Sequence, residues 1–178
     1  MTAPQLEVTE AELREGLAAC LAVPRWVNDV VARAPFASLP QLLEVAEAAA
    51  TPLTQEEVDQ ALAHHPRIGE RAVGDRAEHA FSRAEQQSSA SPDEELARAL
   101  AAGNAAYEAR FGRVFLIRAA GRSRPEILAE LQRRLRLGDD EELTVVAAEL
   151  RDIALRRIAQ LFTTDSNSGS DERRPDPE

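Results

Sequence analysis

The sequence predicts an all-α protein, a single-domain multi-helix bundle over residues 1–162 followed by a disordered acidic tail over residues 163–178. Alanine and leucine dominate the chain while aromatic residues reach only 4 %, a composition that favours helices over a β-sandwich. Helix-start patterns of the type Ser/Thr-x-x-Glu/Gln recur along the chain. One apolar run, Val114–Ile117, could pass for a strand, but nothing else in the chain offers it a partner.

The first four helices are predicted from their start and stop signals. Thr9, Ser38 and Thr54 each stand three residues before Glu or Gln, as the first residue of a capping box does. Pro24 suits the first turn of a helix, and Pro35 ends that helix. The helices predicted in this way cover residues 13–22, 24–34, 41–50 and 56–65.

The later helices follow the same signals. Ser82 opens a short helix, Ser91 opens a long one, and Ser123 opens a third that Gly138 closes. The predicted ranges for the long helix, the third and the final amphipathic helix are 94–112, 125–137 and 141–162. Between the first two of these ranges, the VFLI run is expected to be a buried crossing from helix to loop. After residue 162 no hydrophobic residue remains, which predicts disorder.

Charge and composition exclude several classes of function. The net charge of −10 repels phosphate backbones and anionic lipids, so neither nucleic acid nor a membrane surface is an expected partner. The chain has one cysteine, which fits a reducing compartment. No apolar run is long enough to span a bilayer and the N-terminus lacks the pattern of a secretory signal, so a cytoplasmic location is expected.

The stretch HHPRIGE, residues 64–70, contains two of the three histidines. Pro66 ends the preceding helix, because a proline disfavours helical backbone in the residue before it. The ordinary interpretation of His65 is a histidine at the negative end of a helix dipole. The functional interpretation is that the long polar loop after it presents the ring in a site, with Pro66 limiting where the ring points.

Neither a metal centre nor a nucleophile is predicted. His64 and His65 are adjacent, so on a helix they point about 100° apart and cannot share one ion. His79 is the only other imidazole, and the chain has no metal-binding spacing. Cys20 lies on an alanine- and leucine-rich helix, where a buried and inert thiol is expected. An enzyme with this inventory would work by proton transfer and electrostatics.

Two further stretches have a structural and a functional interpretation. Ser82-x-x-Glu85 is an ordinary capping box, but a helix N-terminus also seats anions, and a carboxylate there can share a histidine's proton. Asn104 and Tyr107 lie three residues apart on one helix face, where they could bond neighbours or face water. Arg157, on the last helix, is either a solvated charge or an anchor for a carboxylate.

Taken in order, these stretches resemble one family, 2-oxo-4-hydroxy-4-carboxy-5-ureidoimidazoline (OHCU) decarboxylase. The resemblance covers about residues 9–162, and Arg67 gives the HPRIG form of bacterial members. It rests on His-Pro-Arg-Ile-Gly at 65–69, Ser-x-x-Glu-Gln at 82–86, N-x-x-Y-x-x-x-F-G-x-x-F-L-I at 104–117, Gly-Arg-Ser at 121–123 and the ending IALRRIAQLF.

The resemblance implies an all-helical, cofactor-free decarboxylase, often homodimeric, that binds a small molecule and forms (S)-allantoin in the degradation of urate. The catalytic acid/base of the family falls on His65, with Glu85 as its partner. The substrate-binding positions fall on Pro66, Ser82, Gln86, the main chain of Phe115, Leu116, Ile117, Arg118 and Ala119, and Arg157. No metal is implied.

Two other functions compete with this one. The chain could be a non-catalytic helical binding or scaffold module whose polar motifs are helix caps and whose acidic tail recruits a partner. It could also hydrolyse a related ureide, but neither a metal set nor a nucleophile supports that reaction.

Overall fold

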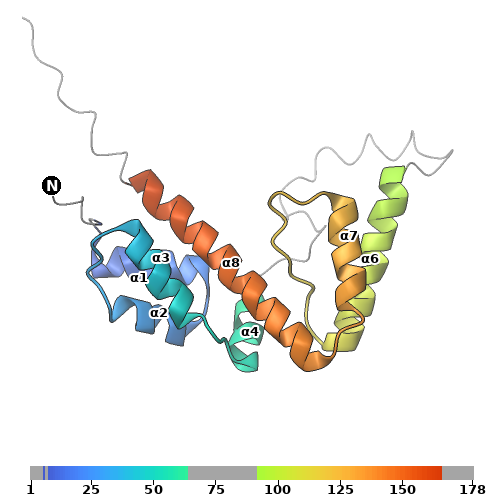
Figure 1. Ribbon diagram of the computed structural model, residues 1–178, viewed down its shortest axis with the longest axis horizontal. Helices are drawn as coiled ribbons and strands as arrows, with labels where there is room; N and C mark the ends of the chain where they lie inside the picture. Colours follow the sequence, from blue (N-terminus) through green and yellow to red (C-terminus); the bar gives the residue numbers. More distant parts are fainter. Residues whose placement is uncertain (1–5, 7, 64–91, 166–178) are drawn as a thin grey trace, which may run out of the picture. The chain divides into compact units, whose positions relative to one another are not determined.

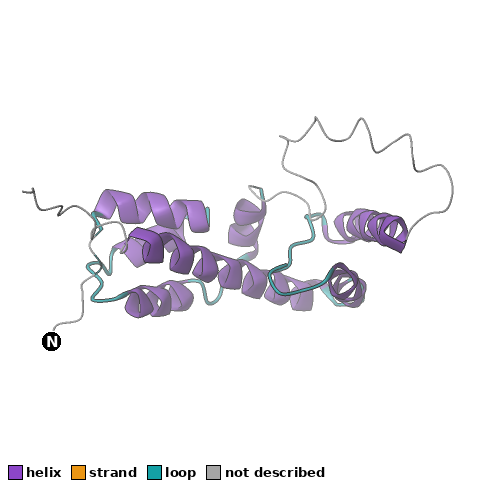
Figure 2. Cartoon of the chain, turned by 90° about the horizontal axis from the view of Figure 1, so that it is seen from above, coloured by secondary structure: helices purple, strands orange, loops and turns teal. Residues whose placement is uncertain are grey.

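The computed structural model describes residues 6, 8–63 and 92–165, and within these ranges the chain is helical with no strand (Figure 2). The predicted all-α class is confirmed. None of the described helices is both long and apolar enough to cross a membrane. The helices are α1 (Glu10–Cys20), α2 (Pro24–Val31), α3 (Leu39–Ala49), α4 (Gln55–Leu62), α6 (Pro92–Phe111), α7 (Arg124–Arg134) and α8 (Asp139–Asp165) (Figure 1).

The chain divides into two compact units, one of residues 1–61 and 150–178 and the other of residues 62–149. Helix α8 contributes to both, because its residues up to Glu149 belong to the second unit and those from Leu150 to the first. The helix continues to Asp165, three residues beyond the end predicted from composition. Residues 166–178 of the predicted tail lie outside the described residues.

In the first unit, helix α2 packs against α1 and α3, and its Trp26 lies in the core. Trp26 is fully buried and its indole Nε1 donates to the Ala46 carbonyl at 2.9 Å, so its polar edge is satisfied inside the core. Arg25 joins α2 to α4, since its guanidinium donates to both carboxylate oxygens of Glu57. These hydrogen bonds lower the pKa of the Glu57 carboxyl. The contacts fix α4, the helix that precedes the predicted histidine.

Local capping explains where several of the helices begin. The Thr9 amide donates to Glu12 Oε2 at 2.8 Å and the Glu12 amide donates to Thr9 Oγ1 at 3.2 Å. The same reciprocal pair occurs between Ser123 and Glu126 at the start of α7. The predicted capping boxes at Thr9, Thr54 and Ser123 are confirmed, whereas Ser38 caps the Gln41 amide without the reciprocal bond. Helix α4, by contrast, ends at Leu62 rather than at residue 65, because a proline sets only the last position that a helix can reach.

The second unit is built from α6, α7 and the first part of α8, and α6 and α7 lie side by side (Figure 1). Its core is a cluster of Leu100, Tyr107, Phe115, Ile117, Ile127 and Leu131. Two glycines with left-handed backbone, Gly112 at φ 67° and Gly121 at φ 80°, stand near the ends of the segment that joins α6 to α7. A side chain is strained in that conformation, so glycine suits both turns.

Gly103 is a point of close approach between α6 and α7, and this contact supports a prediction. A Cβ atom at Gly103 would lie 2.5 Å from Leu131 Cδ2 and 3.2 Å from its Cγ, and Leu131 is fully buried. We expect Gly103→Ala to destabilise the fold by about 1 kcal/mol, because overpacking costs about 1–3 kcal/mol and the better helix propensity of alanine returns about 1 kcal/mol. Urea unfolding measures the difference.

The control is the same change in a Leu131→Ala background. Removing the leucine side chain opens the space that the new methyl group needs, so Gly103→Ala should there increase the free energy of unfolding. A destabilisation that is equal in the two backgrounds would contradict the close approach of α6 and α7.

Candidate functional site

The predicted site residues fall into three groups. His65, Pro66, Ser82, Glu85 and Gln86 lie outside the described residues. Residues 115–119 are described and belong to the second unit, and Arg157 is described and belongs to the first unit. The segment 115–119 is therefore the part of the predicted site whose surroundings the structure defines in most detail.

This segment is a buried crossing with irregular backbone, as predicted, and not a strand. Phe115, Leu116 and Ile117 are only 2 %, 5 % and 3 % exposed, whereas Arg118 is half-buried and Ala119 is exposed. The Phe115 ring packs edge-on against the Tyr107 ring, with 5.2 Å between the ring centroids. The apolar side chains thus anchor the segment in the core. The polar groups of its main chain need hydrogen-bond partners of their own.

A buried charged cluster lies beneath the segment. Arg134 and Glu142 are both 0 % exposed, and Arg134 Nε donates to the two Glu142 carboxylate oxygens at 2.9 and 3.1 Å. The Tyr107 hydroxyl donates to Glu142 Oε1 and accepts from Arg134 Nη2 at 3.4 Å. Burial and the hydrogen bond to Glu142 raise the pKa of Tyr107, so the phenol stays neutral. Tyr107 therefore bonds its neighbours inside the core and does not face water.

The cluster reaches the main chain of the segment through its arginine. Arg134 Nη1 donates to the Leu116 carbonyl at 2.6 Å, and the guanidinium carbon lies 4.7 Å from the centroid of the Phe115 ring. One planar side chain thus binds a carboxylate, a carbonyl and the face of a ring. A fully buried charge persists only with such partners, so the position of Leu116 is tied to Arg134.

A second carboxylate holds the next part of the segment. Glu149, on α8, accepts a hydrogen bond from the Arg118 amide at 2.7 Å through Oε2. Its Oε1 atom lies 3.7 Å from Arg122 Nη1, and this ion pair links Glu149 to the turn before α7. The side chain of Glu149 is 12 % exposed. Arg134, Glu142 and Glu149 were all missed in the sequence, because no motif distinguishes them from the many other charged residues.

Arg157 makes its described contact with α1. Its Nη1 atom donates to the Cys20 carbonyl at 3.3 Å. Arg157 and the neighbouring Arg156 are both exposed. Arg157 is therefore held at the C-terminal end of α1, where its charge also favours the negative end of the helix dipole.

Cys20 is a buried thiol, as predicted, and its reactivity can be tested. It is 3 % exposed, and burial raises its pKa to about 11. The folded state thus favours the neutral thiol, and this contribution to stability is lost as the pH rises through about 11. At pH 8 we expect iodoacetamide to modify the folded chain at least roughly 100-fold more slowly than the urea-unfolded chain, because the thiolate is that much rarer. Equal rates would contradict this burial.

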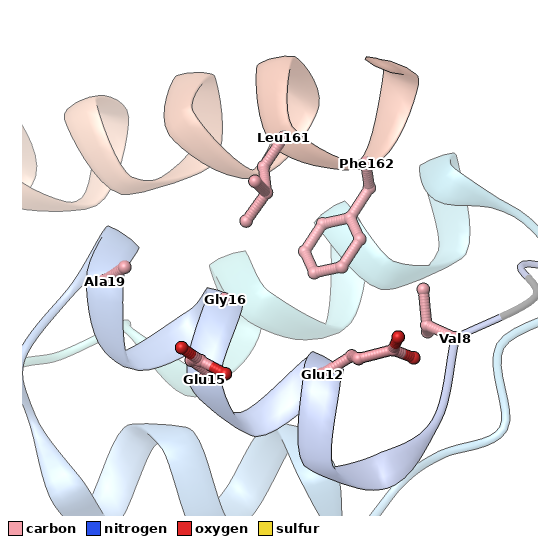
Figure 3. A pocket seen from close by; sticks show the side chains of 7 residues that line it. All are labelled: Val8, Glu12, Glu15, Gly16, Ala19, Leu161 and Phe162. Carbon is pink, nitrogen blue, oxygen red and sulfur yellow. The ribbon is translucent and has the colours of Figure 1, made fainter. Parts of the chain in front are cut away.

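The first unit contains a separate pocket between α1 and the end of α8 (Figure 3). It has a volume of about 400 Å³, and its wall includes the carboxylates of Glu12 and Glu15 and the side chains of Leu161 and Phe162. Gly16 lies where the two helices approach, since a Cβ atom there would be 2.8 Å from Leu161 Cδ2. Of the predicted site residues that the structure describes, residues 115–119 and Arg157, none lines this pocket.

Comparison with known proteins identifies one family by its sequence model and a shared fold among solved structures. A family model described as OHCU decarboxylase matches residues 7–159. A crystal structure of OHCU decarboxylase in the presence of (S)-allantoin is 24 % identical, with a TM-score of 0.66, and the match covers 84 % of this chain and 98 % of that one. A crystal structure of (S)-allantoin synthase is 17 % identical, with a TM-score of 0.62, and the match covers 87 % of this chain and 51 % of that one. At these identities the two structures show a shared fold. A search of curated proteins found no match.

Proposed function

The chain belongs to the OHCU decarboxylase family, and from that premise we propose that it decarboxylates OHCU to (S)-allantoin with His65 as general acid/base and Glu85 as the partner of His65. The observation that supports this reaction is the family match over residues 7–159. It does not favour the alternative of a non-catalytic scaffold. The order of motifs from residue 65 to residue 117 supports the roles of the individual residues.

The substrate itself supplies an acceptor for the electrons that decarboxylation releases. Its carboxylate sits on a ring carbon next to a carbon–nitrogen double bond, which takes up the electron pair as carbon dioxide leaves. The protein must therefore hold the carboxylate in a productive orientation in a pocket that excludes water. It must also deliver a proton to one face of the adjacent ring carbon, because that step sets the S configuration.

His65 suits the proton transfer, since an imidazole titrates near neutral pH and can both accept and donate a proton. Glu85 would keep His65 in the correct charge state, and Pro66 would line the pocket beside the ring. Substrate recognition would then fall on the remaining predicted residues, which are Ser82, Gln86, the main chain of Phe115–Ala119 and Arg157. Hydrogen bonds from main chain and side chains could read the ureido and ring amide groups, and Arg157 could meet the carboxylate.

The direct test is an activity assay in which the substrate is generated in situ. OHCU is unstable, so it is generated from urate by the two preceding enzymes, and the handedness of the allantoin is followed by circular dichroism. The proposal predicts an excess of the S enantiomer that grows with the amount of this chain. If the handedness and the rate are the same with and without the chain, the proposed reaction is wrong.

Glu85→Gln tests the partner of the histidine. We expect lower activity and a pH profile displaced towards lower pH, because the lost carboxylate no longer stabilises the imidazolium and the pKa of His65 falls. Ser82→Ala is the matched variant, since it removes a cap and a substrate contact without removing a charge. If the pH profile of Glu85→Gln coincides with the wild-type profile, Glu85 is only a helix cap and not the partner of His65.

The assembly and location of the protein belong to the same proposal. The resemblance to a family with many dimeric members supports a homodimer, and the acidic chain with one buried cysteine supports the cytoplasm. Light scattering on the purified protein would give twice the mass of the chain for a dimer, and a single-chain mass would contradict it.

A further inference from the structure

The main chain of residues 116–119 is held at three points. The Leu116 carbonyl accepts from Arg134, the Arg118 amide donates to Glu149, and the Ala119 carbonyl accepts from the Arg122 amide at 3.0 Å. Among the described residues, neither the N–H nor the C=O group of Ile117 has a hydrogen-bond partner, although Ile117 is only 3 % exposed. Buried peptide groups are nearly always paired with protein, water or a ligand.

The partners of Leu116 and Arg118 explain why the N–H and C=O groups of Ile117 have no hydrogen bond. In a trans peptide unit, the C=O bond of one residue and the N–H bond of the next point in opposite directions, and the peptide bonds on both sides of Ile117 are trans. Leu116 and Arg118 are two residues apart, and both are bound by side chains of the same unit. The Ile117 N–H therefore points away from the carbonyl that Arg134 binds, and the Ile117 C=O points away from the amide that Glu149 binds, so both groups are available to a ligand.

The two holding residues differ in how firmly they are themselves fixed. Arg134 is locked by Glu142 and Tyr107 inside the core, so its replacement would disturb the whole unit. Glu149 is partly accessible, and its described contacts are to the Arg118 amide and to Arg122. Removing its carboxylate would release residues 117–119 while the buried cluster stays in place.

We propose that Glu149 is a positioning residue for substrate binding: by holding the Arg118 amide it fixes the orientation of the Ile117 peptide groups, which the substrate then bonds. This inference rests on the proposed function. Glu149 does not touch the reacting atoms, so its loss should weaken binding more than it slows the chemical step. A free segment must be ordered by the substrate at each binding event, and that cost appears in KM.

The test compares Glu149→Leu with Glu149→Gln. The leucine removes the acceptor for the Arg118 amide, and we expect KM to rise roughly 10-fold with kcat changed less than 3-fold. The glutamine amide keeps an oxygen that can accept the same hydrogen bond, so its KM should stay within about 3-fold of the wild-type value. Glu130→Leu is the control, because it removes a carboxylate of α7 that pairs with Arg133 rather than with the segment.

Thermal unfolding and (S)-allantoin binding by titration calorimetry complete the experiment. A purely structural role would lower the melting temperature of Glu149→Leu and leave KM unchanged at assay temperature, which would overturn the inference. A glutamine variant as impaired as the leucine variant would also overturn it. In both cases an active wild-type chain keeps the proposed function intact. A wild-type chain that neither forms nor binds (S)-allantoin would overturn the inference together with the proposed function.

Discussion

Replacing His65 with alanine is expected to lower the rate of (S)-allantoin formation roughly 10²–10⁴-fold, the usual contribution of a positioned acid/base group. The variant should still fold, because the change follows the end of α4 and leaves every apolar residue of the described core in place. Far-ultraviolet circular dichroism of the protein verifies the fold, and the optical activity of the product measures the loss. His65→Gln should behave in the same way, since an amide can donate a hydrogen bond but cannot transfer a proton near neutral pH.

The neighbouring histidine provides a matched control. His64→Ala removes an imidazole of the same size one position earlier in the chain, and it should retain nearly the wild-type rate. This contrast separates the chemistry of one ring from a general effect of the double histidine on the loop. A His65→Ala variant that forms (S)-allantoin at the wild-type rate would remove the proposed acid/base.

The largest effect on stability is expected from Glu142→Leu. This change leaves the Arg134 guanidinium fully buried without its carboxylate and deprives the Tyr107 hydroxyl of its acceptor. Breaking a buried ion pair by removing one partner costs about 3–5 kcal/mol, much of it the cost of the unpaired charge. We therefore expect the free energy of unfolding in urea to fall by about that amount, measured by far-ultraviolet circular dichroism.

Two further variants identify the cause. Glu130→Leu breaks an exposed carboxylate–arginine pair on α7 and should cost no more than about 1 kcal/mol. The double variant Arg134→Met/Glu142→Leu replaces both charges with apolar side chains, so it should recover more than half of the loss. If the single and double variants were equally unstable, lost packing rather than the unpaired charge would be the reason.

The helices were predictable because their signals are local. A capping box such as Thr9–Glu12 or Ser123–Glu126 spans only four residues, and both are present in the structure. Helix ends were less predictable. Pro66 fixed only the furthest possible end of α4, and the polar composition after residue 162 did not prevent α8 from continuing to Asp165. A short polar stretch at the end of a long helix can remain helical because each added residue extends an existing helix rather than starting a new one.

The surroundings of the candidate site were less predictable because they depend on contacts between distant residues. The burial of the VFLI run could be predicted from its apolar side chains. Its main-chain partners could not, because Glu149 lies 31 residues beyond Arg118 and Arg134 lies 18 residues beyond Leu116. Tyr107 shows the same limit. The sequence could not decide whether its side chain bonds neighbouring residues or faces water, and only the fold brings its hydroxyl to Glu142.

The chain has 21 arginines and no lysine, so coupling it to a surface or a dye through a side-chain amine requires an introduced lysine. Arg133 and Arg134 differ completely in their suitability. Arg133 is 47 % exposed and could become an amine handle, whereas the planar fork of Arg134 faces a carboxylate, a carbonyl and an aromatic ring at once. The tetrahedral ammonium of lysine cannot reproduce that geometry, so labelling schemes should leave position 134 untouched.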